Sequence, residues 1–438
     1  MEPPKEKTSA EKSTEVAKRI RRLVKEMAAE AHEAKAKGTP IAYFFIVSFY
    51  DEIIRAMGIV PWGTENYAGL CAVKMDAERF LLKAEAEGYP NYLCSYATCI
   101  LGFDAMRREL GGMPPGAPDG GLEYPSMMLG TGMMICDPRY KWYQAAQRYN
   151  NVPMHIHGLL TPTTDANLQE VQDYYIKYNT EELKGLVDFL ERQTGRKMDW
   201  DQLSHVTDLA ERTQRVWWEA YQLRKAIPAP MPTEDAVNTM VPGWFMMGTQ
   251  RALDFYQELY NEVRYRVDHK IGVISDEKYR LMWGMSLPPW YGLVLFNYFE
   301  SLGAVFPIEV VYHPPPPVDI PPRISHPLER IAWRTFNQLT HWHEKARKHG
   351  TDPFVEWFLE LIEDYKIDGV VLHQAMTCRT IHTGQLHQIR MLRKYSDIPV
   401  LLLEGDIVDV RNYNEAATHD KIDAFIEVVD AYKKRKHS

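Results

Sequence analysis

A short apolar run near the C-terminal end of the chain most constrains its fold. Val370-Val371-Leu372 follows the turn residues Asp368-Gly369, and the amphipathic stretch 354–365 predicts a helix before that turn. A run of β-branched residues that follows a helix is typical of a buried parallel strand. The run leads to Cys378, so we expect this cysteine just beyond the carboxyl end of a strand, where open α/β sheets bind ligands.

Strands and helices alternate in two parts of the chain, and this alternation predicts parallel sheets. The expected strands and strand-like runs are 41–47, 59–62, 126–135 and 152–156 in residues 39–165, and 279–283, 305–311, 370–372 and 400–403 in residues 276–438. The order of strand, serine-containing loop, helix, glycine and strand at 41–62 recurs at 279–311, which indicates a duplicated α/β unit.

Two other segments predict helices without strands. Residues 1–38 are rich in Lys, Glu and Ala and predict an N-terminal helix with a narrow apolar stripe, resting on the body or on a partner. Residues 166–275 predict a helical insertion, in which Asp199 is the expected N-cap of one helix. Its helices are expected at 168–177, 180–193, 200–225 and 249–267. The predicted fold class is therefore α/β, with two parallel-sheet lobes and N-terminal and central helical additions.

Composition excludes several classes of protein. The formal charge of −8 argues against a nucleic-acid-binding face, and no apolar run approaches the ~18 residues that would span a membrane. The first residues lack the apolar region of a signal peptide. Five cysteines, an odd number without a secretory signal, argue against a disulfide framework, so we expect a reducing, cytoplasmic location.

Three of the five cysteines are candidates for a shared site. Cys94 and Cys136 stand in settings that are expected to be comparable to that of Cys378. Their wide separation rules out a zinc ribbon or a ferredoxin-like run, both of which need short, paired spacings. We hypothesise that the three thiolates meet between the two α/β lobes and hold an iron–sulfur cluster. The alternative is that each is a small buried hydrophobe, as free cysteines often are.

Two other polar residues follow predicted strands and could reach the same crevice. Ser48 follows the first strand, and Glu65 lies in a predicted loop at 63–67 after the second. A partly desolvated carboxylate at this place could move protons. The alternative for both side chains is helix capping or turn bonding.

Other motifs give weaker signals. His155 and His157 would face the same side of an extended segment and could share a metal, but no third ligand is evident nearby, and ordinary polar contacts are the alternative. Gly130-Thr131-Gly132 is too short for a dinucleotide fingerprint, and the chain lacks a phosphate loop for ATP.

Several motifs, taken in order, resemble the 2-hydroxyacyl-CoA dehydratase D-component family. They are the far-separated Cys94, Cys136 and Cys378, the opening stretch Ser48-Phe49-Tyr50-Asp51-Glu52-Ile53-Ile54-Arg55-Ala56-Met57-Gly58-Ile59-Val60-Pro61, and the closing Val400-Leu401-Leu402-Leu403-Glu404-Gly405-Asp406. Within the family, three further motifs look most like the larger active-site subunit of ATP-dependent benzoyl-CoA reductase. These are Glu65-Asn66-Tyr67, Tyr92-Leu93-Cys94-Ser95-Tyr96 and Cys136-Asp137-Pro138-Arg139-Tyr140-Lys141-Trp142.

The resemblance implies two flavodoxin-like (Rossmann-like) lobes and a [4Fe-4S] cluster held by three cysteines. The matching positions are Cys94, Cys136 and Cys378, and the fourth iron position is left to a non-cysteine ligand or to substrate. Cys71 and Cys99 have no implied role, and either could replace Cys94. Ser48 and Glu65 match positions near the cluster and are the catalytic candidates.

The resemblance also implies partners and a reaction. A homologous second active-site subunit would pair with this chain, and ATP-hydrolysing iron–sulfur activator subunits, supplied by ferredoxin, would inject electrons. The substrate would be an aryl-CoA, with benzoyl-CoA reduced to cyclohexa-1,5-diene-1-carbonyl-CoA in anaerobic aromatic degradation. The alternatives are a 2-hydroxyacyl-CoA dehydratase subunit and a non-catalytic electron-relay or scaffold subunit.

Overall fold

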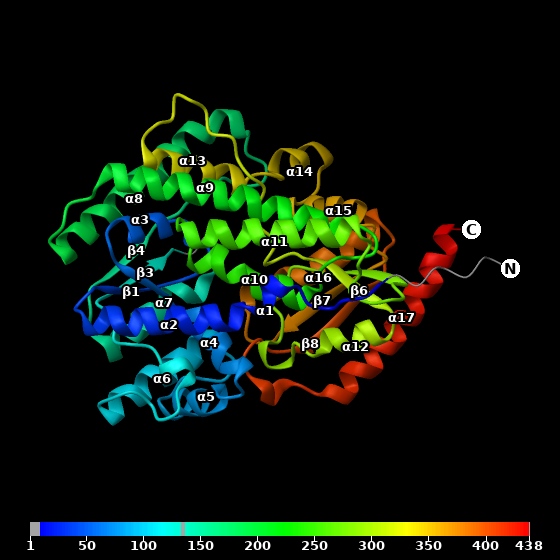
Figure 1. Ribbon diagram of the computed structural model, residues 1–438, viewed down its shortest axis with the longest axis horizontal. Coiled ribbons are helices and arrows are strands. Elements are labelled where there is room, and N and C mark those ends of the chain that lie inside the picture. The colour runs from blue at the N-terminus through cyan, green and yellow to red at the C-terminus, as the bar shows by residue number, and fades with distance from the viewer. Residues whose placement is uncertain (1–8, 133–135, 438) are drawn as a thin grey trace.

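The framework of the protein is a pair of four-stranded parallel sheets, seen side by side in the computed structural model (Figure 1). The structure describes residues 9–132 and 136–437. The first eight residues, the end of the predicted run at 126–135 and the last residue therefore lie outside the described part. The first sheet contains β1 (Ile41–Phe44), β2 (Val60–Gly63), β3 (Met127–Thr131) and β4 (Met154–His157). The second contains β5 (Tyr279–Trp283), β6 (Ala304–Glu309), β7 (Gly369–Ala375) and β8 (Val400–Gly405).

Both sheets have the same strand order. The orders are β2-β1-β3-β4 and β6-β5-β7-β8, so in each sheet the first strand of the chain lies between the second and the third. This is the flavodoxin-like arrangement, in which the chain changes direction between the first and third strands and leaves a crevice at their carboxyl ends. The predicted α/β class with two parallel-sheet lobes is confirmed, and the repeated order agrees with the predicted recurrence of one α/β unit.

The helices of the first lobe differ from the prediction at one important place. They are α3 (Asp51–Ala56), α4 (Thr64–Val73), α5 (Ala77–Ala86), α6 (Ser95–Leu110) and α7 (Asp137–Asn150). The predicted loop at 63–67 is wrong, because β2 passes directly into α4 with Gly63 as the N-cap. Glu65 lies in the first turn of α4, where a carboxylate interacts favourably with the helix dipole.

Four long helices connect the lobes. They are α8 (Leu168–Thr194), α9 (Trp200–Gln222), α10 (Thr233–Phe245) and α11 (Gln250–Asp268). The predicted cap of α9 is confirmed, since Asp199 accepts hydrogen bonds of 3.0 Å from the amides of Asp201 and Gln202. The helices predicted at 168–177 and 180–193 are one helix, because the Asn179 amide group bonds the Leu160 backbone instead of breaking α8. α10 has no counterpart among the helices predicted from the sequence.

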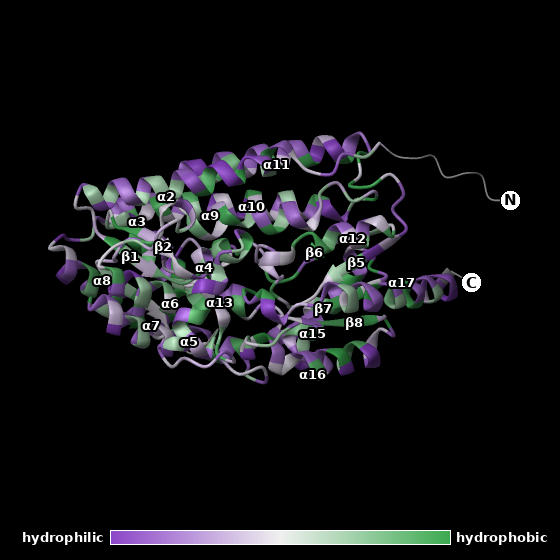
Figure 2. Cartoon of the chain, turned by 90° about the horizontal axis from the view of Figure 1, so that it is seen from below, coloured by the Kyte–Doolittle hydropathy of each residue, from purple (hydrophilic) through white to green (hydrophobic). Residues whose placement is uncertain are grey.

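Helices also cover the second sheet. They are α12 (Leu295–Ser301), α15 (Pro353–Asp364), α16 (Arg379–Tyr395) and α17 (Glu415–His437), while α13 (Pro327–Leu339) packs on α8 and α9, and α14 (His343–His349) packs on α15. In the view of Figure 2 the hydrophilic sides of α11 and α2 lie along one outer edge, while the strands are mostly hydrophobic. This division places the apolar side chains between the layers.

The N-terminal segment is part of the body. It forms α1 (Glu15–Lys18) and α2 (Ile20–Ala36), whose apolar residues Val16 and Ile20 belong to the main core. Thr14 caps α1 and binds α10, because its amide and hydroxyl donate to Asp235 Oδ2 at 2.6 and 2.9 Å. The apolar stripe predicted from the sequence therefore rests on the central helices of the same chain.

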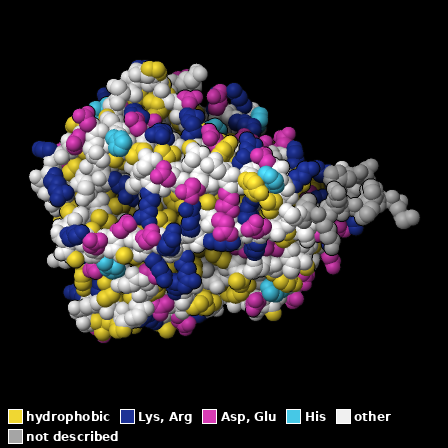
Figure 3. Space-filling model, in the orientation of Figure 1, with side chains coloured by type: hydrophobic (Ala, Val, Ile, Leu, Met, Phe, Trp, Pro, Cys, Tyr) yellow, Lys and Arg dark blue, Asp and Glu magenta, His cyan; other side chains and the backbone are white. Residues whose placement is uncertain are grey.

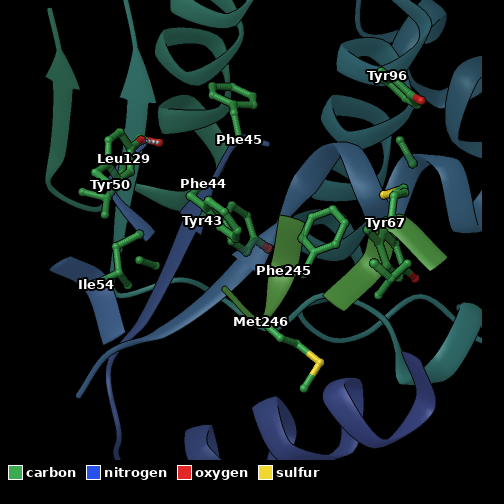
Figure 4. Packing of buried hydrophobic residues seen from close by; sticks show 14 of the residues in the cluster. Tyr43, Phe44, Phe45, Tyr50, Ile54, Tyr67, Tyr96, Leu129, Phe245 and Met246 are labelled. Atoms are coloured by element: carbon green, nitrogen blue, oxygen red, sulfur yellow. Dashed lines mark hydrogen bonds between the residues drawn. The ribbon is translucent and has the colours of Figure 1, made fainter. Parts of the chain in front are cut away.

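The largest hydrophobic core joins the first sheet, the central helices and one end of the second sheet. Figure 4 shows aromatic side chains of β1 lying close to Phe245 of α10, and the rings of Phe44 and Phe245 meet edge to face at 6.3 Å. Ala375 and Cys378, at the carboxyl end of β7, belong to this same core. The crevice end of the second lobe is therefore packed against the first lobe. No helix in the described part of the chain is long and apolar enough to cross a membrane.

Candidate functional site

Two cysteines occupy corresponding places in the two lobes. Cys136 follows β3 and begins α7, while Cys378 follows β7 and begins α16. β3 and β7 are each the third strand along the chain within their sheet. Each cysteine therefore lies beside the crevice between the first and third strands, where the strand order reverses. Cys94 begins α6. Its expected setting at the end of a strand is wrong, because the described residues between α5 and α6 form turns.

The three thiols lie within electrostatic reach of one another. Burial raises the pKa of Cys94 well above its ordinary value, and the nearby thiols of Cys136 and Cys378 raise it further. Burial also raises the pKa of Cys378 to about 11, with a further contribution from Cys136. The structure thus brings together three residues that are far apart in the sequence.

All three thiols stand at helix N-termini. The backbone amide three residues further on favours the thiolate and lowers its pKa in each case: Ala97 for Cys94, Arg139 for Cys136 and Ile381 for Cys378. None of the thiols makes a full capping hydrogen bond. Helix N-termini stabilise thiolates and other anions, so the three helices present one kind of environment to a shared ligand.

The residues beside Cys94 and Cys378 bind each other. The Ser95 amide donates to Thr377 Oγ1 at 3.1 Å, and the two hydroxyl oxygens lie 3.1 Å apart. Thr377 Oγ1 also donates to Asp406 Oδ2 at 2.5 Å, and the other oxygen of Asp406 accepts from the amides of Val408 and Asp409. All three side chains in this bridge are buried. The bridge fixes the loop of Cys94 in the first lobe to the loop of Cys378 in the second.

A second link joins the residues that follow Cys136 and Cys378. Asp137 forms an ion pair with Arg379, and the thiol of Cys136 is hydrogen-bonded to Thr380, which lowers its pKa. This link is more exposed than the bridge between Ser95 and Thr377. Each of the three cysteine loops is thus tied to another loop through residues next to its cysteine.

A buried ion pair lies beside the thiols. Glu65 accepts hydrogen bonds from Arg139 at 2.9 and 3.0 Å and from the Ile46 amide at 3.0 Å. The Arg139 guanidinium lowers the pKa of Cys136, although burial raises it more. Glu65 also lies within electrostatic reach of all three thiols. The predicted proton-moving carboxylate is therefore near the cysteines, but a guanidinium holds it in a fixed orientation.

Ser48 lies in a strained loop at the end of β1. Val47 and Phe49 on either side have φ values of 55° and 61°, which L-residues with side chains seldom adopt. The Ser48 hydroxyl donates to the Phe45 carbonyl and also interacts with the Tyr50 hydroxyl. Ser48 is fully buried, and these contacts are the bonds of a turn.

Three aromatic residues complete the surroundings. Trp290 Nε1 donates to the Tyr96 hydroxyl, and Tyr96 and Tyr312 are hydrogen-bonded to each other. Burial raises the pKa of both tyrosines well above the ordinary value, and the charge of nearby Glu65 acts in the same direction. Both hydroxyls therefore stay protonated and can donate hydrogen bonds.

A cavity of about 480 Å³ opens next to this group. Glu65, Tyr96 and Trp290 form part of its wall, and α1, α2, α4 and α10 supply most of the remainder. Most of its lining is apolar, with residues such as Ile20, Leu70 and Phe245. The cavity can take an apolar ligand whose polar group meets Tyr96 and Glu65.

The other cysteines and the histidine pair that the sequence suggested as ligands are not part of this site. Cys71 and Cys99 are fully buried and interact with each other and with Tyr67. His155 and His157 lie on β4, and burial lowers the pKa of His157 to about 4. Neither pair is grouped with the three thiols.

The chemistry of the donor set suits a soft metal, because thiolates are the ligands of iron–sulfur clusters. Within residues 9–132 and 136–437, no three His, Cys, Asp or Glu side chains form a group that could hold a metal ion. The three thiols are thus neighbours that do not form a closed ligand set in the protein alone.

Several residues of this site were not singled out by sequence reasoning. Ser95 and Thr377 adjoin cysteines, and Arg139 stands one turn after Cys136, so their proximity to a cysteine was the available signal. Tyr312 and Trp290 carried no such signal. Their place depends on how the second lobe packs against the first.

Two flavodoxin-like sheets, with thiols at corresponding helix starts and a cavity beside them, define the class of protein: a two-lobed α/β protein with a site where the lobes meet. The profile of the family described as 2-hydroxyglutaryl-CoA dehydratase, D-component, matches residues 46–429. The chain belongs to this family.

Relatives of known activity are similar along nearly their whole length. The alpha chain of (R)-phenyllactyl-CoA dehydratase from Clostridium sporogenes is 24% identical, over 92% of this chain and 93% of the relative. The alpha chain of (R)-2-hydroxyglutaryl-CoA dehydratase from Acidaminococcus fermentans is 22% identical, over 95% and 97%. One of the benzoyl-CoA reductase subunits of Thauera aromatica is 21% identical, over 90% of both chains. The family is therefore one of enzyme subunits that act on CoA thioesters.

Proposed function

We propose that this chain is the iron–sulfur active-site subunit of an ATP-dependent benzoyl-CoA reductase. The reaction adds two electrons and two protons to the ring of benzoyl-CoA and gives cyclohexa-1,5-diene-1-carbonyl-CoA. The observation that supports this most is the joining of three cysteine loops beside a cavity whose wall contains Tyr96, Trp290 and Glu65. Flat aromatic walls suit a flat aromatic acyl group.

In this proposal Cys94, Cys136 and Cys378 hold a [4Fe-4S] cluster. The bound cluster would supply electrons one at a time at low potential. The raised pKa values of the free thiols mean that protons leave them when iron binds. The N-termini of α6, α7 and α16 then stabilise the negative charge of the thiolates.

The protein's own side chains bind and orient the substrate. The protonated hydroxyl of Tyr96, which lines the cavity and is hydrogen-bonded to Tyr312, can donate a hydrogen bond to the thioester carbonyl oxygen, where negative charge develops on reduction. Glu65, fixed by Arg139, is the candidate for moving protons to the ring. The apolar lining of the cavity excludes water, which suppresses the competing reduction of protons.

We propose partner subunits as well. The relatives are each named as one subunit of an enzyme, which supports assembly with at least one further chain. In our proposal the partners are a homologous second active-site subunit and ATP-hydrolysing iron–sulfur activator subunits that receive electrons from ferredoxin.

A 2-hydroxyacyl-CoA dehydratase subunit is the second candidate function. It is favoured by the relatives from Clostridium sporogenes and Acidaminococcus fermentans, which are dehydratase subunits at slightly higher identity than the reductase subunit. The same fold and the same three thiols would serve both reactions, so the local geometry supports the two almost equally.

A turnover experiment separates these functions. The anaerobically purified complex is supplied with a low-potential reductant and ATP, and is offered benzoyl-CoA or (R)-phenyllactyl-CoA. Formation of the cyclic diene with ATP consumed in proportion to product supports the reductase. Dehydration with only catalytic ATP supports the dehydratase. Full turnover in a complex whose copy of this subunit has lost its cluster would contradict both and favour an electron-relay or scaffold subunit.

A further inference from the structure

The cavity beside the thiols has a positively charged entrance. Lys18, Arg21 and Lys74 line the cavity, and all three side chains are exposed to solvent. They come from α1, α2 and the end of α4, so the N-terminal segment forms one side of the entrance. Figure 3 shows a group of Lys and Arg side chains over the area where Figure 1 draws the start of α2 and α4.

Two of these cations lack a carboxylate partner. Within the described part of the chain, no ion pair involves Arg21 or Lys74, whereas Arg19 and Arg22 on either side of Arg21 pair with Glu258 and Glu26. Lys18 pairs, among the described residues, with the exposed Glu15 of its own helix alone. The entrance therefore holds positive charge that the protein leaves available for an anion.

The carboxylates of the cavity do not cancel this charge. Glu65 is bound by Arg139 at the inner end, which leaves Asp119 as the other carboxylate in the wall. The unpaired Arg21 and Lys74, together with Lys18 and its partner Glu15, thus face one wall carboxylate, Asp119, that forms no ion pair with a described residue. An excess of positive charge at the mouth of a cavity attracts anionic ligands.

The cavity changes character from the entrance inwards. The cations of the wall are exposed to solvent, whereas its apolar side chains such as Ile20 and Val241 are buried, and the hydrogen-bonding groups of Tyr96 and Glu65 are buried near the thiols. A ligand that matches this arrangement of cavity groups has a polyanionic head, a long thin arm and a reactive group at the far end. Coenzyme A thioesters have this form, with phosphates at one end and the acyl group at the other.

We infer that Arg21 and Lys74, with Lys18, bind the phosphates of the coenzyme A moiety, and that α1 and α2 form the entrance of the substrate channel. This inference rests on the proposed function, because it takes a CoA thioester as the substrate. It assigns the N-terminal segment, which begins before the matched family region at residue 46, a direct part in substrate recognition.

Binding to the intact complex, without turnover, tests the inference. Coenzyme A and pantetheine are titrated by calorimetry into the wild-type complex and into complexes with Arg21→Glu, Lys74→Glu or both. Lys25→Glu is the matched control, because Lys25 is an exposed cation of α2 that does not line this cavity and has no ion pair with a described residue. We expect the double variant to bind coenzyme A about tenfold more weakly, with pantetheine unaffected and the control unchanged.

Three results would overturn the inference. They are unchanged coenzyme A affinity in the double variant, an equal loss in Lys25→Glu, and a loss of pantetheine affinity in the double variant as large as that of coenzyme A. Failure of the proposed function would look different, since the wild-type complex would bind coenzyme A at this entrance and yet produce neither diene nor dehydrated product.

Discussion

Ser95 and Thr377 are 282 positions apart in the sequence, yet their hydroxyl oxygens lie 3.1 Å apart in the interior. Each residue adjoins a cysteine of the candidate site, Cys94 or Cys378. The contact crosses from one lobe to the other, so the relative placement of the two thiols depends on a buried polar bridge. Buried polar networks of this kind favour one arrangement because an unpaired member is costly.

Thr377→Val should weaken this bridge. The change keeps the shape of the side chain but leaves the buried Ser95 amide and Asp406 carboxylate each with one partner fewer. We expect the free energy of unfolding to fall by about 1–3 kcal/mol, measured by urea denaturation. Thr383→Val is the control, since the exposed Thr383 hydroxyl bonds only the Arg379 carbonyl of its own helix. Equal denaturation midpoints for the two variants would contradict the role of the bridge.

Glu65→Gln should destabilise the first lobe. Arg139 would keep its charge in a buried place without the carboxylate that now neutralises it, and breaking such a pair costs about 3 kcal/mol. The midpoint of chemical denaturation measures the effect. Glu404→Gln is the matched control, because Glu404 pairs with Lys421 at the surface and should contribute less than about 0.5 kcal/mol. If the two variants lost the same stability, the ion pair of Glu65 and Arg139 would not be a structural element of the site.

Removal of single thiols should separate the proposed ligands from the other cysteines. We expect Cys94→Ser, Cys136→Ser and Cys378→Ser each to lower the iron and acid-labile sulfide content of the anaerobically purified complex by more than half, because serine is a poor ligand for iron–sulfur clusters. Cys71→Ser and Cys99→Ser are the controls, since these residues interact with each other in the core between α4 and α6. Full iron content in Cys378→Ser would remove that residue from the ligand set.

Buried His313 should make the fold sensitive to acid. Burial, with nearby Arg224, lowers its pKa from the ordinary 6.5 to about 3, so the folded protein holds it neutral. As the pH falls, the unfolded chain takes up the proton before the folded protein does. The contribution of His313 to the free energy of unfolding is therefore fully present above pH 6.5 and is lost as the pH falls towards 3. At pH 5 the loss is about 2 kcal/mol.

A comparison of variants isolates this effect, because other groups titrate in the same range. The pKa values of Asp51 and Glu300 are raised by burial to about 7, and these carboxyls oppose the loss by taking up protons in the folded state. Stability is measured between pH 7 and 5 for the wild type, His313→Gln and the exposed control His205→Gln. We expect only His313→Gln to lose less stability than the wild type over this interval. Parallel curves for all three proteins would refute the assignment.

Much of the fold follows from local patterns. The strand predicted at 279–283 coincides with β5, and Asp199 caps α9 as expected, because both signals depend on side chains close together in the chain. Local patterns failed where tertiary packing decided the outcome. Gly63 begins a helix instead of a loop, and α10 contains Pro242 and is buried on nearly all sides, so no polar face marks it as a helix.

The sequence by itself determined the alternation of strands and helices, and with it two parallel-sheet lobes whose strand ends carry Cys136 and Cys378. The periodicity of side chains along the chain is a local property, so it predicts which faces are buried but not what they are buried against. Only the tertiary structure decided that Ser95 meets Thr377 and that Arg139 holds Glu65. Such contacts join segments that the chain brings together only when both sheets and the helices between them have packed.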